Sequence, residues 1–225
     1  MLSTAVDTVL HGNILNTTPP TIVVSSYRLG DLVLLSLTAD EKKALMQDHP
    51  NSLGDIYIKE RAKPSNNGIS NLSIFRTILD RINVSTVPLP DDIAESIVLH
   101  LRLGDVVAGN EWHEKQKRPL SIEQLQKMMQ SAIAIYPHYK SVYIIGKPFF
   151  AHTSSTNYDE CVAMSEAYKA EVCAAFPSAI HFNGGYTDID VMCATQAAVF
   201  VQGKGYFSQL ICKVRELRGQ PCVRC

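Results

Sequence analysis

SIVLHLRLGD, residues 96–105, is the stretch that decides the fold. It starts with a short apolar run at 97–99 that includes two β-branched residues, which is typical of a strand buried on both faces. Alternation follows, so that His100 and Arg102 share one face while the leucines on either side of Arg102 share the other. The pattern predicts a central strand that delivers two polar side chains to its end.

The residues that close this stretch predict a turn. Gly104 permits a sharp exit with positive φ, and Asp105 can accept hydrogen bonds from the backbone of the following loop. Ligands of open α/β sheets bind beyond the carboxyl ends of the strands. We therefore expect Arg102, held by a rigid strand at that edge, to bind an anionic group.

Strand and helix patterns alternate after this strand. Each apolar run of strand length is followed by a segment with helical spacing or a capping signal. This order predicts an α/β fold with a Rossmann-like, doubly wound parallel sheet. The expected helices are 121–135, 158–176, 187–195 and 209–217, and the expected strands are 141–146, 179–182 and 197–202.

The first part of the chain is less regular. We expect residues 1–90 to form a short N-terminal region or reduced first lobe, and residues 91–225 to form the Rossmann-like domain. Apolar residues at helical spacing within 71–82 indicate packing against a core. The other elements expected here are strands at 21–26 and 55–58 and a short helix at 38–46.

Composition narrows the function classes. The chain has 225 residues, a formal net charge of -1 and 46% hydrophobic residues, which is globular and gives no general attraction for nucleic acid or anionic membranes. No apolar run is long enough to cross a membrane, and the first residues do not resemble a signal peptide. We expect a soluble chain that inserts into no membrane, with the compartment left open. Sequons at Asn16, Asn71 and Asn83 matter only in a secretory lumen.

All six cysteines lie in the last third of the chain. Most occur in apolar, helix-like sequence, where a free thiol behaves as a small core residue. Cys222 and Cys225 form a C-x-x-C pair without the second pair or histidines that complete a zinc site. We therefore predict no bound metal.

A glycine-containing turn, Gly203-Lys204-Gly205, follows the last expected strand and leads into a helix. Backbone N–H groups at a helix amino end favour phosphate, so this turn is a candidate phosphate cradle. Lys204 supplies a second cation beside Arg102, and Ser208 lies in the same turn-to-helix segment. The pattern favours an anionic ligand between the two strand ends.

Several of these features occur in one order: Val98-x-His100-x-Arg102-x-Gly104-Asp105, a helix, the strand ending at Gly146, then Asp190-Val191-Met192 and the turn at 203–208. Over residues 70–218 this resembles the donor-binding half of the fucosyltransferase superfamily, which includes α1,2-, α1,6- and protein O-fucosyltransferases. The resemblance implies a GT-B-like donor lobe that transfers a sugar from a GDP-sugar, GDP-fucose in that family, to a glycan or protein acceptor without a metal or other cofactor.

The resemblance also implies roles for individual residues. Arg102 would bind the donor pyrophosphate with His100 beside it, and Gly104 and Asp105 would complete that turn. Gly203, Lys204, Gly205 and Ser208 would contact the phosphate or nucleoside. Asp190 either partners the helix dipole alone or orients the base or ribose. His113 and Glu114, in the polar loop after the central strand, are candidate general bases toward the acceptor hydroxyl.

Two other hypotheses remain open. Asp188-Ile189-Asp190 is a D-x-D sequence, which would hold a metal on the nucleotide sugar in a metal-dependent glycosyltransferase. A non-catalytic nucleotide-sugar-binding or interaction domain would keep the sheet without the chemistry. Metal dependence separates the first of these from the arginine-based scheme, and binding without transfer identifies the second.

Overall fold

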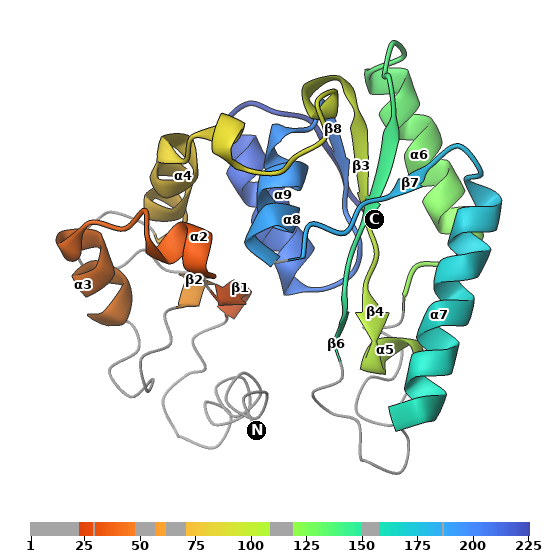
Figure 1. The fold of residues 1–225 in the computed structure, drawn as a ribbon, viewed down its shortest axis with the longest axis horizontal. Helices are drawn as coiled ribbons and strands as arrows, with labels where there is room; N and C mark the ends of the chain where they lie inside the picture. Colours follow the sequence, from red (N-terminus) through yellow and green to blue (C-terminus); the bar gives the residue numbers. More distant parts are fainter. Residues whose placement is uncertain are drawn as a thin grey trace.

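A five-stranded parallel sheet forms the centre of the chain in this computed structural model (Figure 1). Its strands are β3 (Ile97–His100), β5 (Val142–Ile145), β7 (Ile180–His181), β8 (Val199–Val201) and β9 (Cys222–Val223). The structure describes residues 23–28, 30–47, 57–61, 71–108, 119–149, 158–185 and 187–225. His113 and Glu114 lie outside these ranges.

The strand order places a change of direction at β3. The spatial order is β7-β5-β3-β8-β9, so the chain first winds from β3 through β5 to β7 and then returns to the other side of β3. All neighbours in this sheet pair in parallel. This confirms the predicted α/β class with a parallel sheet, and the order matches that of dinucleotide-binding Rossmann sheets.

Helices cover both faces of the sheet (Figure 1). Helices α6 (Ile122–Ile135) and α7 (Tyr158–Ala175) pack with Leu99 and Leu101 on one face. Helices α8 (Thr187–Gln196) and α9 (Tyr206–Leu217) pack on the other face with Val98 and Phe200. The alternation predicted for 96–105 is therefore observed, since odd-numbered and even-numbered residues of β3 enter different cores. None of the described helices is long and apolar enough to cross a membrane.

Local sequence explains where some helices begin. Ser121 and Gln124 form the predicted capping box at the start of α6. In α7, Ala163 and Ala170 are exposed, while Cys161 and Ser165 are buried. Alanine fits either face of a helix, so its spacing is a poor guide to the buried side.

The N-terminal region packs on α8 and α9. The stripe predicted at 71–82 is buried in α4 and shares one core cluster with Met192 and Leu210. Thr38 and Glu41 form a reciprocal cap before α3. The remaining elements are β1 (Val23–Arg28) and β2 (Tyr57–Arg61), which pair antiparallel, α2 (Asp31–Leu34), α3 (Ala39–Gln47), α4 (Asn71–Arg81), η1 (Val84–Thr86), η2 (Ile93–Glu95), β4 (Leu103–Gly104), α5 (Asp105–Ala108) and β6 (Pro148–Phe149).

The predicted start of the last helix was wrong. Helix α9 begins at Tyr206, earlier than the predicted 209, because Gly205 with φ of 98° serves as its N-cap. Cys222 lies in β9, a two-residue edge strand that is too short to show alternation, and forms a disulfide with Cys212 of α9. Cys225 remains free and exposed.

A buried arginine ties this C-terminal segment together. Arg215 of α9 is fully buried and donates to the carbonyl oxygens of Ala194, Ala197, Ala198 and Pro221 at 2.7–3.0 Å. Burial lowers the pKa of Arg215 to about 10, so the guanidinium stays charged at neutral pH. One side chain therefore joins the end of α8, the start of β8 and the approach to β9.

We expect Arg215→Met to lower the free energy of unfolding by about 3 kcal/mol or more, because buried carbonyl groups lose their donors. Urea denaturation measures the loss. Arg224→Met is the control: Arg224 pairs with Glu216 at the surface, and removing an exposed pair costs about 1 kcal/mol or less. Equal losses in the two variants would contradict this role for Arg215.

Candidate functional site

The ends of β3 and β8 meet at the carboxyl edge of the sheet. These strands pair in parallel up to Leu99 and Val201, and the chain leaves them at His100 and Gly203. A Cβ atom at Gly203 would lie 2.6 Å from His100 Nδ1 and closer still to the His100 carbonyl oxygen. Only glycine allows this approach, because it lacks a Cβ atom. Gly203 therefore lets the ends of β3 and β8 come into contact.

Arg102 lies beside the amino end of α9. A Cβ atom at Gly205, the N-cap of α9, would lie 3.7 Å from Arg102 Cδ and 3.9 Å from Arg102 Nε. Gly205 provides no capping side chain, and a helix amino end carries partial positive charge. The structure therefore places a guanidinium and a helix amino end side by side, at the point where the strand order reverses.

Buried hydroxyl groups hold the backbone on both sides of this contact. Ser208 is fully buried, and its Oγ donates to the Gly203 carbonyl oxygen at 2.7 Å. Gly104 has φ of 93°, and its N–H donates to the Oγ of buried Ser165 in α7 at 3.1 Å. Ser208 was predicted to contact the donor and Gly104 to complete the turn after Arg102. In the structure, these hydrogen bonds position the two turns.

His100 is a buried, neutral histidine. Its side chain stacks at a tilt on Phe207, with ring centroids 5.2 Å apart. Burial, aided by the charge of Arg102, lowers the pKa of His100 to about 3. Within the described residues, His100 Nδ1 is buried without a hydrogen-bond partner. His100 Nδ1 is thus a buried polar atom, packed against Gly203, whose hydrogen-bonding capacity is unused within the described residues.

Asp190 is a second buried group with an unused atom. It is 3% exposed, and its Oδ1 has no hydrogen-bond partner in the described part of the chain. Burial raises the pKa of Asp190 to about 6, although the charge of Lys147 acts in the opposite direction. Lys147 follows β5 at the same carboxyl edge, so Asp190 and Lys147 extend the polar group that begins at His100.

Asp188 has a different environment although it lies on the same turn of α8. Its carboxylate accepts from the N–H of Gly30 at 3.1 Å and of Val33 at 3.2 Å. It therefore caps the short helix α2 of the N-terminal region. Asp188 is only 2% exposed and both of its oxygens are used by backbone donors, which is a structural role.

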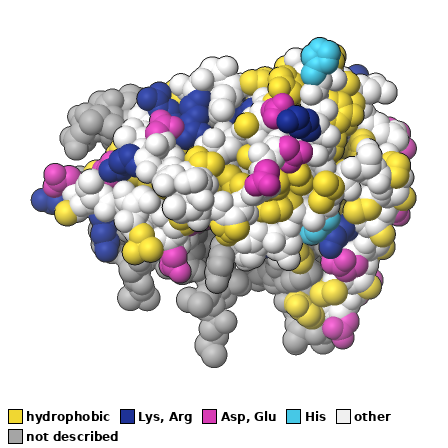
Figure 2. Space-filling model, turned by 45° about the horizontal axis from the view of Figure 1, so that its top comes forward, with side chains coloured by type: hydrophobic (Ala, Val, Ile, Leu, Met, Phe, Trp, Pro, Cys, Tyr) yellow, Lys and Arg dark blue, Asp and Glu magenta, His cyan; other side chains and the backbone are white. Residues whose placement is uncertain are grey.

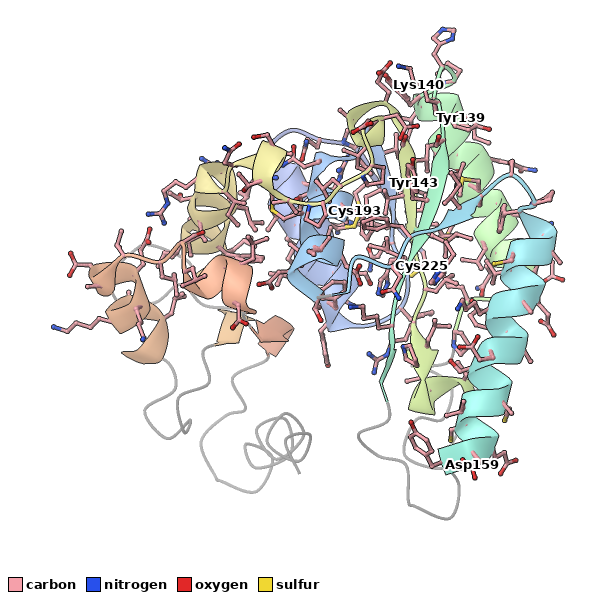
Figure 3. The ribbon with its side chains drawn as sticks, viewed as in Figure 1. Tyr139, Lys140, Tyr143, Asp159, Cys193 and Cys225 are labelled. Atoms are coloured by element: carbon pink, nitrogen blue, oxygen red, sulfur yellow. A yellow bond between two sulfur atoms is a disulfide. The ribbon has the colours of Figure 1, made fainter. Side chains whose placement is uncertain are left out.

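The amino edge of the sheet offers a contrast. Tyr143 and Ser141 both donate to the Asp92 carboxylate, at 2.6 Å and 2.5 Å, and Lys140 pairs with Glu95 at 2.6 Å. Lys140 and Tyr143 lie along the upper part of β5 in Figure 3. These groups satisfy one another, although Gln220 Oε1, just before β9, has no hydrogen-bond partner among the described residues. At the carboxyl edge, two ionisable side chains, His100 and Asp190, retain unused buried atoms, which favours this edge as the functional one.

The structure thus brings together part of the predicted site. Gly203 lies against His100, Gly205 lies beside Arg102, and Lys204 belongs to the same turn as the two glycines. Asp105 begins α5, but its side chain lies outside the described part of the structure, as do both candidate general bases, His113 and Glu114. Sequence reasoning missed Lys147, Phe207 and Ser165, of which Lys147 carried a signal as the first charged residue after a buried strand.

Neither metal-ligand geometry nor comparison with known proteins assigns a function to this chain. Among the described residues, no group of three or more His, Cys, Asp or Glu side chains is arranged to hold a metal ion. No family model matches the chain, and a search of curated proteins finds no match. The function must therefore be argued from the site itself.

The buried Asp190 carboxylate, one oxygen of which has no hydrogen-bond partner in the described residues, lowers the stability of the folded protein near neutral pH. Its pKa in the folded protein, about 6, is higher than the usual 3.8 of an unfolded chain, so the folded state binds the proton more tightly. Stability then falls as pH rises through about 4 to 6 and stays low above that range. We expect Asp190→Asn to remove this fall and to raise the free energy of unfolding by about 2 kcal/mol near neutral pH.

Thermal unfolding at about pH 5 and pH 7.5 measures this difference. Asp188→Asn is the matched control on the same helix turn, and it should lower the melting temperature at both pH values because a backbone donor loses its acceptor. A loss of stability in Asp190→Asn at neutral pH would show that this carboxylate has a stabilising partner.

Proposed function

We propose that the chain is a glycosyltransferase of the fucosyltransferase-like type, with a GT-B-like donor lobe that binds a GDP-sugar at the carboxyl edge between β3 and β8. The observation that carries the proposal is the position of Arg102 beside Gly205, the N-cap of α9. Rossmann sheets bind nucleotides where the strand order reverses, and β3 and β8 flank that point here. The sequence resemblance described above supports the same donor class.

The chemistry of sugar transfer fits these groups. When the sugar leaves, negative charge grows on the terminal phosphate of the nucleoside diphosphate. A fixed guanidinium can bind two phosphate oxygens at once and stabilise that charge. The amino end of α9 adds partial positive charge at the same place. Arg102 is therefore the residue expected to stabilise the leaving group.

The metal-dependent alternative has less support. It needs both acids of the D-x-D sequence on one metal ion, but Asp188 already accepts two backbone N–H groups. Asp190 alone retains an unused oxygen. In the scheme proposed here, transfer proceeds with EDTA present, and strict dependence on manganese would reject it.

We expect Arg102→Ala to weaken GDP binding by about 100-fold, because two charge-assisted hydrogen bonds are lost. The GDP affinity of Arg102→Lys should lie between those of Arg102→Ala and the wild type, since an ammonium group keeps the charge without the planar fork. Isothermal titration with GDP and GDP-sugars measures affinity, and release of GDP from GDP-fucose measures transfer. Neither variant should lower the melting temperature of the free protein by more than a few degrees.

Arg81→Ala is the control. Arg81 is an exposed residue of α4 that pairs with Glu41, remote from the carboxyl edge, and its loss should leave GDP affinity unchanged. Wild-type affinity in Arg102→Ala would contradict the proposed site. Tight GDP-sugar binding without transfer to any acceptor or to water would instead identify a non-catalytic binding domain.

A further inference from the structure

Arg102 and Lys147 occupy matching positions on neighbouring strands. Pairing between β3 and β5 runs to His100 and Ile145, and the Leu101 N–H donates to the Ile145 carbonyl oxygen at 2.8 Å. Pairing resumes between β4 and β6 at Leu103 and Pro148 with the same offset along the chain. With this offset, Leu101 lies opposite Gly146 and Arg102 lies opposite Lys147 between the two ladders.

Both side chains belong to the face covered by α8 and α9. In β3 and its continuation, Leu101 and Leu103 enter the core under α6 and α7, which places Arg102 on the opposite face. In β5, Ile145 enters the core under α8 and α9, and Lys147 has the same parity. Two separate contacts agree with this placement.

The first contact is that of Arg102 with Gly205, where α9 begins. The second is electrostatic: burial raises the pKa of Asp190, which lies in the first turn of α8, and the charge on Lys147 acts against that rise. Arg102 and Lys147 thus face two helices that lie on the same side of the sheet. The strand register and the neighbouring helices therefore place Arg102 and Lys147 on the same face of the sheet.

Arg102 and Lys147 are two positively charged side chains on neighbouring strands, so their placement requires an explanation. Neighbouring strands lie about 4.8 Å apart, and like charges directly opposite each other on a sheet repel. The chain has a net charge of -1, and charged side chains of both signs are interspersed on the face drawn in Figure 2. At the carboxyl edge, Arg102 and Lys147 lie on neighbouring strands, so an anion with two adjacent charged groups can contact both side chains.

We propose that Lys147 and Arg102 form a paired clamp for the two adjacent phosphates of a diphosphate ligand. This inference rests on the proposed function, because it assigns a second phosphate-binding residue, Lys147, to the same site. Arg102, next to the amino end of α9, holds one phosphate, and Lys147 holds the other.

The clamp makes Lys147 a residue that distinguishes diphosphates from monophosphates. Pyrophosphate and inorganic phosphate test this without a base or sugar, and GDP and GMP test it on the complete nucleotide. We expect Lys147→Met to weaken pyrophosphate and GDP binding by about tenfold, the effect of one charge-assisted hydrogen bond, and to change phosphate and GMP binding by less than about threefold.

Lys140→Met is the matched control, because Lys140 precedes the same strand at the amino edge and pairs with Glu95 (Figure 3). Lys140→Met should leave the affinities for pyrophosphate, phosphate, GDP and GMP unchanged. Lys147→Arg keeps the positive charge and should restore most of the preference for diphosphates. Both lysines are outside the buried core, so circular dichroism and melting temperature should match the wild type.

The outcomes separate this inference from the proposed function. If GDP binds and depends on Arg102, but Lys147→Met weakens GDP and GMP equally or not at all, the clamp is wrong and the proposed site remains. If neither pyrophosphate nor any nucleoside diphosphate binds the wild-type protein, both are wrong. A selective loss for pyrophosphate and GDP in Lys147→Met, absent from Lys140→Met, supports the clamp.

Discussion

The close approach of Gly203 to His100 is the constraint on which the site depends. A side chain at position 203 would collide with the backbone and ring of His100, so glycine sets how near β8 can leave the sheet beside β3. That contact places Gly205, and with it the amino end of α9, against Arg102. The positive groups of the site are thus assembled by backbone packing, before any ligand is present.

The rest of the domain holds this contact in place. Ser208 secures the turn between β8 and α9, and Ser165 of α7 secures the exit after β3. Arg215 ties α9 to the carbonyl groups around the start of β8. Each of these side chains is almost fully buried and hydrogen-bonded, whereas His100 and Asp190 keep buried atoms without partners in the described residues. Hydrogen-bonded buried side chains thus stabilise the fold, whereas His100 and Asp190 lie at the carboxyl edge, where we propose that the ligand binds.

Much of the fold could be predicted from local patterns, because alternation and capping act over a few residues. The strand at 96–105 and the capping box of Ser121 are of this kind. Contacts between distant segments could not be predicted. Asp188 was a candidate metal ligand of the D-x-D sequence, yet it caps a helix that lies far away in the sequence. The importance of Lys147 depends on strand register, which becomes visible only when β5 is placed beside β3.

The most direct measurement is a titration of the isotope-labelled protein with GDP, followed through its backbone amide resonances. The amides of Gly203 and Gly205 should show the largest shifts, because they lie where the phosphates are expected to bind. Gly219, after the far end of α9, should not change. Shifts centred on the amino edge, around Lys140 and Ser141, would contradict the placement of the site between β3 and β8.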